Sequence, residues 1–478
     1  MPSTFYGMEI GSRALTTNQI ALDVVGQNIA NINTPGYSRQ VVDIQESDPF
    51  TPPDLNHTHP GALGTGVTAA SITRVRDNYL DQQYRDANSQ QAALNNISDT
   101  LGQVQSAFNE PSTSGLGAQM TNFFNSFSDL SSNPQSDAVR STVVNQAQSV
   151  VSMFHSVSTS LSQIAPNLQT NITDNINNAN NIAQQIASLN HTIRFSVAAG
   201  DHPNDLEDQR DNLVDQLSQI ADVQVVEVRD PQSNQDTGEV NVNVGGYALV
   251  QGDTANALPT QVTTSNGVLG LVTPSNDTIP LNGGNLYGLI KATTLVSGYL
   301  KNLDSLASQF ITSVNAQHSL GVGLDGQSGR NFFTGNNAAT IAVSSTITSN
   351  LDTIAAAAAP APPNTFAPGN GDNATALAAL STTQVINGFS LTDYYNSSIA
   401  QIGADTQSYQ NQANTQQSVV SQVQNQQQSV SGVNLDEELT KMLQYQRSYQ
   451  AAARVINVMD ACVDQIISSL GSTAATGG

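Results

Sequence analysis

Roughly the last forty residues of the chain carry hydrophobic side chains at a spacing of seven. Two interleaved series with this spacing describe the a and d positions of a helix that packs lengthwise against another helix. The pattern predicts one long helix that begins at Asn434, with Glu437 completing a capping box. The first series consists of Leu435, Met442, Tyr449, Ile456, Val463 and Leu470, and the second of Glu438, Tyr445, Ala452, Met459 and Ile466.

The start of the chain carries a matching but narrower series. Gly11 and Asn18 interrupt it, so this helix is weak alone and depends on a packing partner. The helix must end before Pro35, because proline moves the preceding residue out of helical geometry. Pro35-Gly36 then fits the centre of a tight turn. The members of the series are Met8, Leu15, Leu22 and Ile29.

The two terminal helices are expected to pack against each other, because their seams share one period. A helical hairpin that closes an ordinary domain is the simplest structure with this pattern. We expect Leu22 and Ile29 to face the apolar seam around Ile456 and Val463. Repeats of seven residues imply a left-handed supercoil.

Between the ends, the hydrophobic period changes from seven to two and back, which indicates helices, then strands, then helices. The predicted fold class is mainly α with an inserted β domain. It is an elongated coiled-coil helical bundle formed by the N- and C-terminal segments, with the β-rich domain projecting from the middle. The expected segments are an N-terminal coiled-coil helix (1–40, pairing with 434–478), an extended ribbon or loop (41–76), a helical rod domain (77–221), a β-rich domain (222–285), a rod helix (286–320), a loop with an Ala/Pro-rich linker (321–390), a long rod helix (391–433) and the C-terminal coiled-coil helix (434–478).

The chain is acidic and poor in charged residues. Its 478 residues include 15 Lys and Arg against 38 Asp and Glu, which gives a formal net charge of −23. Nucleic-acid binding needs clustered Lys and Arg, so this function class is excluded. No apolar run is long enough to span a membrane, and no cleaved signal peptide is visible. The single cysteine, Cys462, rules out an intramolecular disulfide.

Three segments contain residue types that are found in chemical sites. His57 and His59 form an HxH pair, but no Cys or carboxylate cluster surrounds them, which favours a solvated loop over a metal site. Residues 321–326 match GxGxxG, yet a dinucleotide site needs a strand before the glycines and a helix after them. The acids around Arg210 fit ion pairs on a helix face better than a catalytic cluster. We therefore predict no enzyme activity, no cofactor and no metal.

Segments near both ends resemble the terminal motifs of flagellar rod, hook and hook-associated proteins. Residues 28–40 (NIANINTPGYSRQ) carry the N-terminal motif, and residues 431–438 (SGVNLDEE) carry the C-terminal one. With residues 426–434 (QQQSVSGVN) included, the chain is most similar to the flagellar hook-associated protein 1 family, and residues 208–211 resemble that family too. The motif residues that this resemblance assigns to assembly are Asn28, Asn31, Thr34, Pro35, Gly36, Tyr37, Gly432, Val433, Asn434, Leu435 and Glu437.

The resemblance implies a structural subunit of the bacterial flagellum at the junction between hook and filament, which self-assembles through its terminal helices. It implies copies of itself in a ring, the hook protein on one side, a further hook-associated or filament protein on the other, and an export chaperone. It also implies an extracellular location, reached by flagellar type III export without a cleaved signal peptide.

Two alternatives stay open at this point. A flagellar hook or rod structural protein has similar terminal motifs, but its middle should be mostly β. A secreted adhesin or enzyme on a helical stalk would need an active site within residues 222–390, where none is visible.

Overall fold

The computed structural model describes residues 5–49, 64–264, 268–359 and 367–473. His57 and His59 lie outside the described residues. The chain forms two compact units. Unit 1 contains residues 1–88, 179–258 and 418–478, and unit 2 contains residues 89–178 and 259–417.

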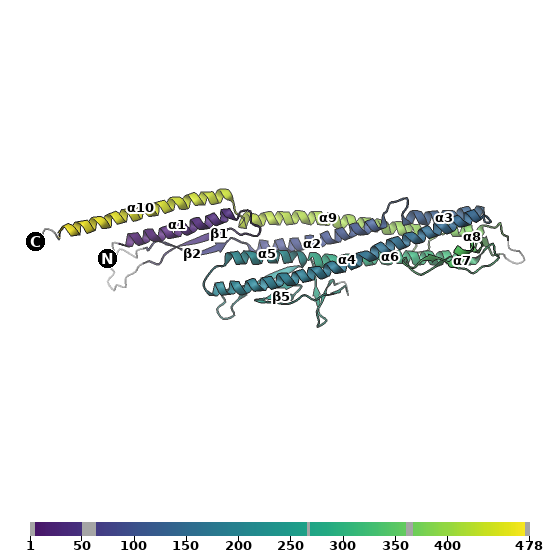
Figure 1. The fold of residues 1–478 in the computed structure, drawn as a ribbon, viewed down its shortest axis with the longest axis horizontal. Coiled ribbons are helices and arrows are strands. Elements are labelled where there is room, and N and C mark those ends of the chain that lie inside the picture. Colours follow the sequence, from purple (N-terminus) through teal and green to yellow (C-terminus); the bar gives the residue numbers. More distant parts are fainter. Residues whose placement is uncertain (1–4, 50–63, 265–267, 360–366, 474–478) are drawn as a thin grey trace. The chain divides into compact units, whose positions relative to one another are not determined.

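Helices dominate both units, and small antiparallel sheets lie in the middle of the sequence, so the predicted class of a mainly α protein with inserted β structure is confirmed (Figure 1). Helices α2, α4 and α9 each contribute residues to both units. The helices are α1 (Tyr6–Ala30), α2 (Asn78–Phe108), α3 (Leu116–Ser132), α4 (Asp137–Ala198), α5 (Asn204–Ile220), α6 (Gly284–Leu320), α7 (Ser345–Ser349), α8 (Asp372–Ala379), α9 (Leu391–Ser431) and α10 (Leu435–Thr473).

All strand pairs are antiparallel, in five sheets of the described chain. Unit 1 holds the hairpin β1-β2 and the sheet β3-β4-β5-β6, and unit 2 holds β7-β8-β9, β10-β13 and β11-β12. The strands expected within residues 222–285 thus belong to two sheets in different units. The strands are β1 (Gln40–Glu46), β2 (Val67–Arg74), β3 (Val223–Arg229), β4 (Asp236–Val244), β5 (Tyr247–Gln251), β6 (Thr254–Ala255), β7 (Gln261–Thr263), β8 (Gly270–Val272), β9 (Thr278–Pro280), β10 (Gly321–Val322), β11 (Phe333–Thr334), β12 (Ala342–Val343) and β13 (Ala357–Ala358).

The core of unit 2 is aromatic. Phe123 of α3 packs edge-on against Phe127, with ring centroids 5.2 Å apart, and tilted against Phe310 of α6 at 5.4 Å. Phe332 and Phe333, from the loop after α6, contact the same ring. All five side chains are fully buried. The aromatic face of α3 is therefore packing surface, because its rings meet at the distances and angles of aromatic core pairs.

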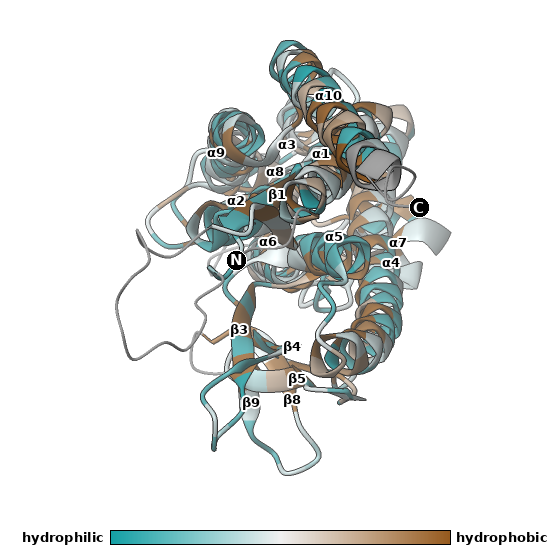
Figure 2. Cartoon of the chain, turned by 90° about the vertical axis from the view of Figure 1, so that its left-hand side faces the viewer, coloured by the Kyte–Doolittle hydropathy of each residue, from teal (hydrophilic) through white to brown (hydrophobic). Residues whose placement is uncertain are grey.

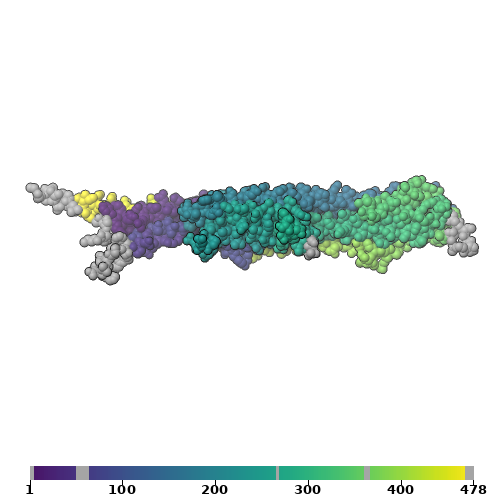
Figure 3. Space-filling model, turned by 90° about the horizontal axis from the view of Figure 1, so that it is seen from below, coloured from purple at the N-terminus to yellow at the C-terminus, as the bar shows by residue number. Residues whose placement is uncertain are grey.

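Unit 1 is organised around the two terminal helices. α1 and α10 lie side by side and run antiparallel, the pairing expected from their matching repeats, and the hairpin β1-β2 packs against α1 (Figure 1). In the space-filling view, the yellow α10 emerges beside the purple N-terminal segment (Figure 3). Ala21 and Val24 of α1 form a buried core with Val42 of β1, and Tyr445 of α10 covers it.

The level at which the two helices meet differs from the expected one. A Cβ atom placed on Gly11 would lie 2.6 Å from Ile456 Cγ1, so Ile456 lies beside Gly11. The expectation that Leu22 and Ile29 face Ile456 and Val463 is wrong, because Asn28 contacts Glu438 and the end of α1 therefore lies beside the start of α10. A seven-residue repeat allows either direction and several registers, so the pattern could not set this level.

The two hydrophobic series of α10 are covered unequally. The second series faces α1, with Glu438 and Ala452 buried and Tyr445 and Met459 half-buried. A straight helix has 3.6 residues per turn and drifts away from a strict repeat of seven, so the two series do not stay equally covered. In the first series, Leu435 and Tyr449 are exposed, Met442, Ile456 and Val463 are half-buried, and the side chain of Leu470 lies outside the described part. In α1, Met8, Leu15, Leu22 and Ile29 are all half-buried.

Candidate functional site

The two terminal motifs meet in unit 1. α1 ends at Ala30, and a turn with Gly36 at φ +80 returns the chain into β1. This turn brings Arg39 against the link between α9 and α10. The Arg39 backbone N–H donates to the Ser431 carbonyl at 2.8 Å, and its guanidinium pairs with Glu437 Oε1 at 3.0 Å. The segments that carry the motifs are thus joined by direct hydrogen bonds.

The start of α10 is capped by Asn434, but without the reciprocal half of the expected capping box. Asn434 Oδ1 accepts from the backbone N–H of Asp436 at 3.0 Å and of Glu437 at 3.3 Å. The Glu437 carboxylate pairs with Arg39 and Lys441. The cap therefore satisfies two free amides of the helix, while Glu437 links α10 to the N-terminal motif.

Asn28 lies at the centre of a buried polar network. Its Oδ1 accepts from the Tyr37 hydroxyl at 2.8 Å and from the Gln40 backbone N–H at 2.9 Å. Its Nδ2 donates to the Gln40 carbonyl and to Glu438 Oε2, each at 2.9 Å. Burial, together with Asp205, Asp208 and Glu438, raises the pKa of Tyr37, so the phenol stays a neutral donor. The network ties α1, the turn, β1 and α10 to one another.

An ionic cluster attaches the hairpin to α5. Ser38 binds Asp208 through its backbone N–H at 2.9 Å and its hydroxyl at 2.7 Å. Arg74 Nη1 lies 2.8 Å from Asp208 and 2.7 Å from Asp211, and Arg76 lies 2.9 Å from Asp211. Burial alone would raise the pKa of Asp211, but Arg76 and Arg74 outweigh it and hold that pKa below its ordinary value. The two arginines thus lie in direct contact with the carboxylates of α5, and these ion pairs hold the hairpin against α5.

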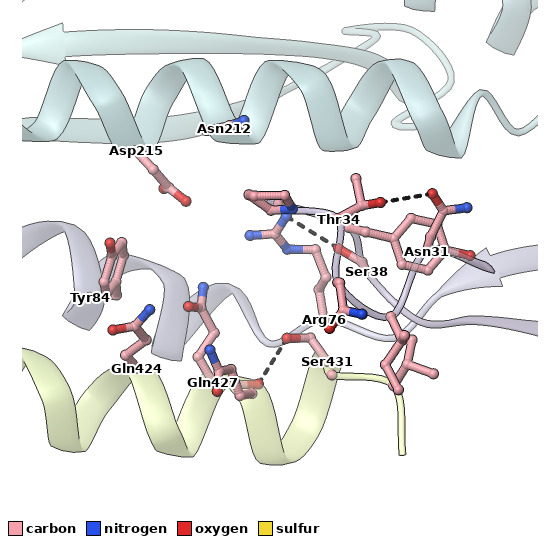
Figure 4. Close-up of a pocket in the computed structure, with 18 of the residues that line it drawn as sticks. Asn31, Thr34, Ser38, Arg76, Tyr84, Asn212, Asp215, Gln424, Gln427 and Ser431 are labelled. Atoms are coloured by element: carbon pink, nitrogen blue, oxygen red, sulfur yellow. Dashed lines mark hydrogen bonds between the residues drawn. The ribbon is translucent and has the colours of Figure 1, made fainter. Parts of the chain in front are cut away.

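A polar cavity of about 640 Å³ opens beside the turn. Figure 4 shows Asp215 and Asn212 of α5, Tyr84 of α2, and Gln424 and Gln427 of α9 around it. The described residues that line it include neither histidine nor cysteine. Most of the lining groups are neutral amides and hydroxyls, which bind by hydrogen bonds. The charged groups of the lining are engaged in ion pairs, Asp215 with Arg85 and Arg76 with Asp81 and Asp211. The lining residues at the turn are Asn31, Ile32, Asn33, Thr34, Pro35, Gly36, Tyr37 and Ser38, and those at the α9–α10 link are Ser431, Gly432 and Val433.

The motif residues fall into two groups, those that bind inside unit 1 and those that line the cavity or the surface. Asn28 is buried and Tyr37 half-buried, and both bind inside unit 1. The other positions line the cavity or the surface: Asn31, Gly432 and Val433 are half-buried, and Thr34, Pro35, Gly36, Asn434, Leu435 and Glu437 are exposed.

Sequence reasoning missed Glu438, Arg74 and Asp208 as members of this site. The signal for Glu438 was visible, because it is the one charged residue on an otherwise apolar seam. Arg74 and Asp208 carried no comparable signal, since 134 residues separate them.

In the described parts of the chain, no group of three or more His, Cys, Asp or Glu side chains is placed to hold a metal ion. Among the helices of the described residues, none has the length and apolar character needed to cross a membrane.

The chain is similar to proteins of the flagellar axis over nearly its full length. Flagellar hook-associated protein 1 of Bacillus subtilis (strain 168) is 32% identical, and the alignment covers 98% of this chain and 99% of that protein. The chain belongs to the flagellar hook-associated protein 1 family. The protein of the same name from Escherichia coli (strain K12) is 28% identical over 95% of this chain and 97% of its own length.

Family models divide the chain in the same way as the motifs do. Residues 101–333 match the flagellar hook-associated protein FlgK helical domain. Residues 8–37 match the flagella basal body rod protein family, and residues 424–469 match the flagellar basal body rod FlgEFG protein C-terminal family. The two terminal matches contain α1 and most of α10, which are the helices that the site joins.

One solved structure has the same fold. The flagellar hook junction protein FlgK from Burkholderia pseudomallei is 20% identical, with a TM-score of 0.60, and it covers 73% of this chain and 100% of its own. This likeness supports the fold of the chain.

Proposed function

We propose that this chain is a structural, non-enzymatic subunit of the bacterial flagellum that forms the junction between hook and filament, assembling through its terminal helices. Its partners are further copies in a ring, the hook protein on one side and a hook-associated or filament protein on the other. The subunit works outside the cell, after type III export. The family membership supports the junction role, and the surface of α10 supports assembly through the terminal helices.

The outward face of α10 carries the observation behind this proposal. Leu443 is 58% exposed and Val458 is 61% exposed, on a helix whose other face is already covered by α1. Figure 2 shows brown, hydrophobic stretches alternating with teal ones along α10. A contiguous apolar patch on a protein surface marks a contact with another molecule. The exposed apolar residues that lie away from the contact with α1 are Leu435, Leu439, Leu443, Val455 and Val458. We call them the outer face of α10.

A second copy of the chain is the expected cover for the outer face. Leu435, Leu439 and Leu443 follow one another about one helical turn apart, so they form an apolar ridge. Such a ridge can pack into the groove of a neighbouring helix. Before assembly, the same stripe would need protection from non-specific association, which is the task of an export chaperone.

Replacing Leu443 and Val458 with Asp should abolish assembly while the subunit stays folded. Both side chains are exposed, so the substitution leaves the core intact and places charges where another subunit would cover them. The measurement is complementation of a motile strain that lacks its own hook-associated protein 1, with immunoblots of the medium. We expect secreted, unassembled protein and no swimming.

The matched control is Asp at Gln444 and Asn457, which are exposed polar positions on the same helix. This variant should swim. Normal swimming of the Leu443/Val458 variant would contradict assembly through the outer face.

The alternative of a hook or rod protein rests on the terminal matches alone, because both carry rod-family descriptions. The middle of the chain favours the junction protein. Residues 101–333 match the helical domain of the hook-associated protein, and they include most of α4 and α6.

A further inference from the structure

The apolar contacts between α1 and α10 do not define a single register. Both helices repeat every seven residues, so a shift of seven exchanges each apolar contact for a similar one. Ile456, which lies beside Gly11, would be replaced by Tyr449 or Val463. Each is a large side chain that can cover the same glycine. Another interaction must therefore select the observed register.

Asn28 of α1 and Glu438 of α10 form a buried polar contact that has no equivalent seven residues away. Each is 1% exposed. The Asn28 amide uses both hydrogens and both acceptor positions, and Glu438 completes this set through Oε2. Its Oε1 accepts from Lys441 Nζ at 2.9 Å. All polar groups of the pair are therefore satisfied in the observed register.

We propose that the Asn28–Glu438 pair selects the register of α10 along α1. In an antiparallel pair, a shift of seven one way sets Glu438 against Ala21 in the apolar core. A shift the other way sets Tyr445 opposite Asn28 and carries Glu438 beyond the end of α1. Both shifts leave the Asn28 amide without its acceptor, Glu438 Oε2. The first shift also buries the Glu438 carboxylate away from Asn28, which is strongly unfavourable. A single buried polar residue fixes the register of coiled coils in the same way.

The selected register positions the outer face of α10, and this last consequence rests on the proposed function. A shift of seven residues moves α10 by roughly 10 Å along its axis. Leu443 and Val458 would then stand at a different level relative to the turn at Gly36 and the hairpin. Two subunits with different registers would therefore present the outer face of α10 at different heights, and the faces could not pack against each other.

Cysteine pairs can report the register directly. In the full chain with Cys462→Ser, Gly11→Cys is combined with Ile456→Cys for the observed register. For the two shifted registers it is combined with Tyr449→Cys or Val463→Cys, each together with Ile456→Ala, so that the new Cβ atom at position 11 does not clash with Ile456. A disulfide needs Cβ atoms about 4 Å apart, so each pair forms only in its own register. The chains are oxidised in a glutathione buffer, both as dilute purified protein and in isolated hooks with assembled junctions. Mass spectrometry and gel mobility give the fraction of intramolecular disulfide.

With Asn28 and Glu438 present, we expect the observed-register disulfide to exceed each shifted one by about tenfold or more. In the Asn28→Leu/Glu438→Leu background the helices still pair through apolar contacts, and this ratio should fall by about the same factor. Glu438→Gln keeps the acceptor for Asn28 and should keep the ratio. Asp460→Asn, which likewise neutralises a carboxylate at an exposed position of α10, is the matched control and should also keep it.

An unchanged ratio in the double-leucine background would overturn the proposal. So would the absence of preference for the Ile456 pair in both preparations with Asn28 and Glu438 in place. The readout is a disulfide within one chain, whereas the proposed function is tested by swimming. A chain that selects its register but fails to assemble therefore counts against the proposed function alone.

Discussion

At the scale of single residues, His318 shows how one side chain holds two loops of unit 2. It is fully buried at the end of α6, with Nδ1 2.8 Å from the Arg330 carbonyl and Nε2 3.0 Å from the Ala355 amide nitrogen. A neutral ring with its proton on Nδ1 donates to Arg330 and accepts from Ala355. Burial lowers the pKa of His318 from 6.5 to about 4, and the nearby Arg330 and Arg140 charges act in the same direction.

This lowered pKa makes the stability of unit 2 depend on pH. Because the pKa is lower in the folded chain, protons bind the unfolded chain more readily, and acid favours unfolding. The stabilisation is complete above about pH 6.5, is lost as the pH falls towards about 4, and amounts to about 3 kcal/mol. Urea unfolding at about pH 7 and about pH 4.5, followed by circular dichroism, measures it.

His318→Gln should remove this part of the pH dependence, because glutamine does not titrate. His202→Gln is the control, since it makes the same change at an exposed position of unit 1 and should leave the pH dependence of unit 2 unchanged. Equal pH dependence in the His318 variant and the native chain would count against the neutral buried ring.

At the scale of the elements, the α1–α10 pair depends on an uninterrupted apolar interface. Ile456→Asp would place a carboxylate beside Gly11, where a half-buried apolar side chain now lies. We expect the free energy of pairing to weaken by roughly 2 kcal/mol or more. Faster hydrogen exchange in α1, with unchanged exchange in the sheet β3-β4-β5-β6, would show this loss.

The same variant should fail to restore swimming. Asn457→Asp introduces the same residue at the exposed neighbouring position and should swim normally. Swimming of the Ile456 variant at native speed would show that the pairing of α1 and α10 is dispensable.

These elements also show what the sequence could and could not predict. Periodicity located α1 and α10 and indicated that they pack together, because an apolar stripe on a helix must be covered. It could not give their direction, which follows from the contact of Arg39 with Ser431. It also placed Glu438 on the seam without a partner, since only the structure shows Asn28 opposite it.

At the scale of the whole molecule, the charge opposes association. The net charge of −23 makes copies of the chain repel each other, while the outer face of α10 attracts them. Raising the salt from about 20 mM to about 500 mM shortens the screening length from ~20 Å to ~4 Å. We expect self-association of the purified chain, measured by sedimentation velocity, to increase over this range. The Leu443/Val458 aspartate variant should show no increase, and weaker association of the native chain at high salt would point to ion pairs as the driving force.

Asn28 and Glu438 are 410 residues apart along the chain, so their contact closes nearly the whole polypeptide into one loop. Contacts between such distant positions form late, because the entropy of closing the loop must be overcome first. Among the described helices α10 comes last in the sequence, so the side of α1 that faces α10 stays open until α10 has been made. A polypeptide cut short before α10 leaves Ala21 and Val24 without Tyr445 and lacks the outer face. If the outer face mediates assembly as proposed, incorporation selects for chains that contain α10.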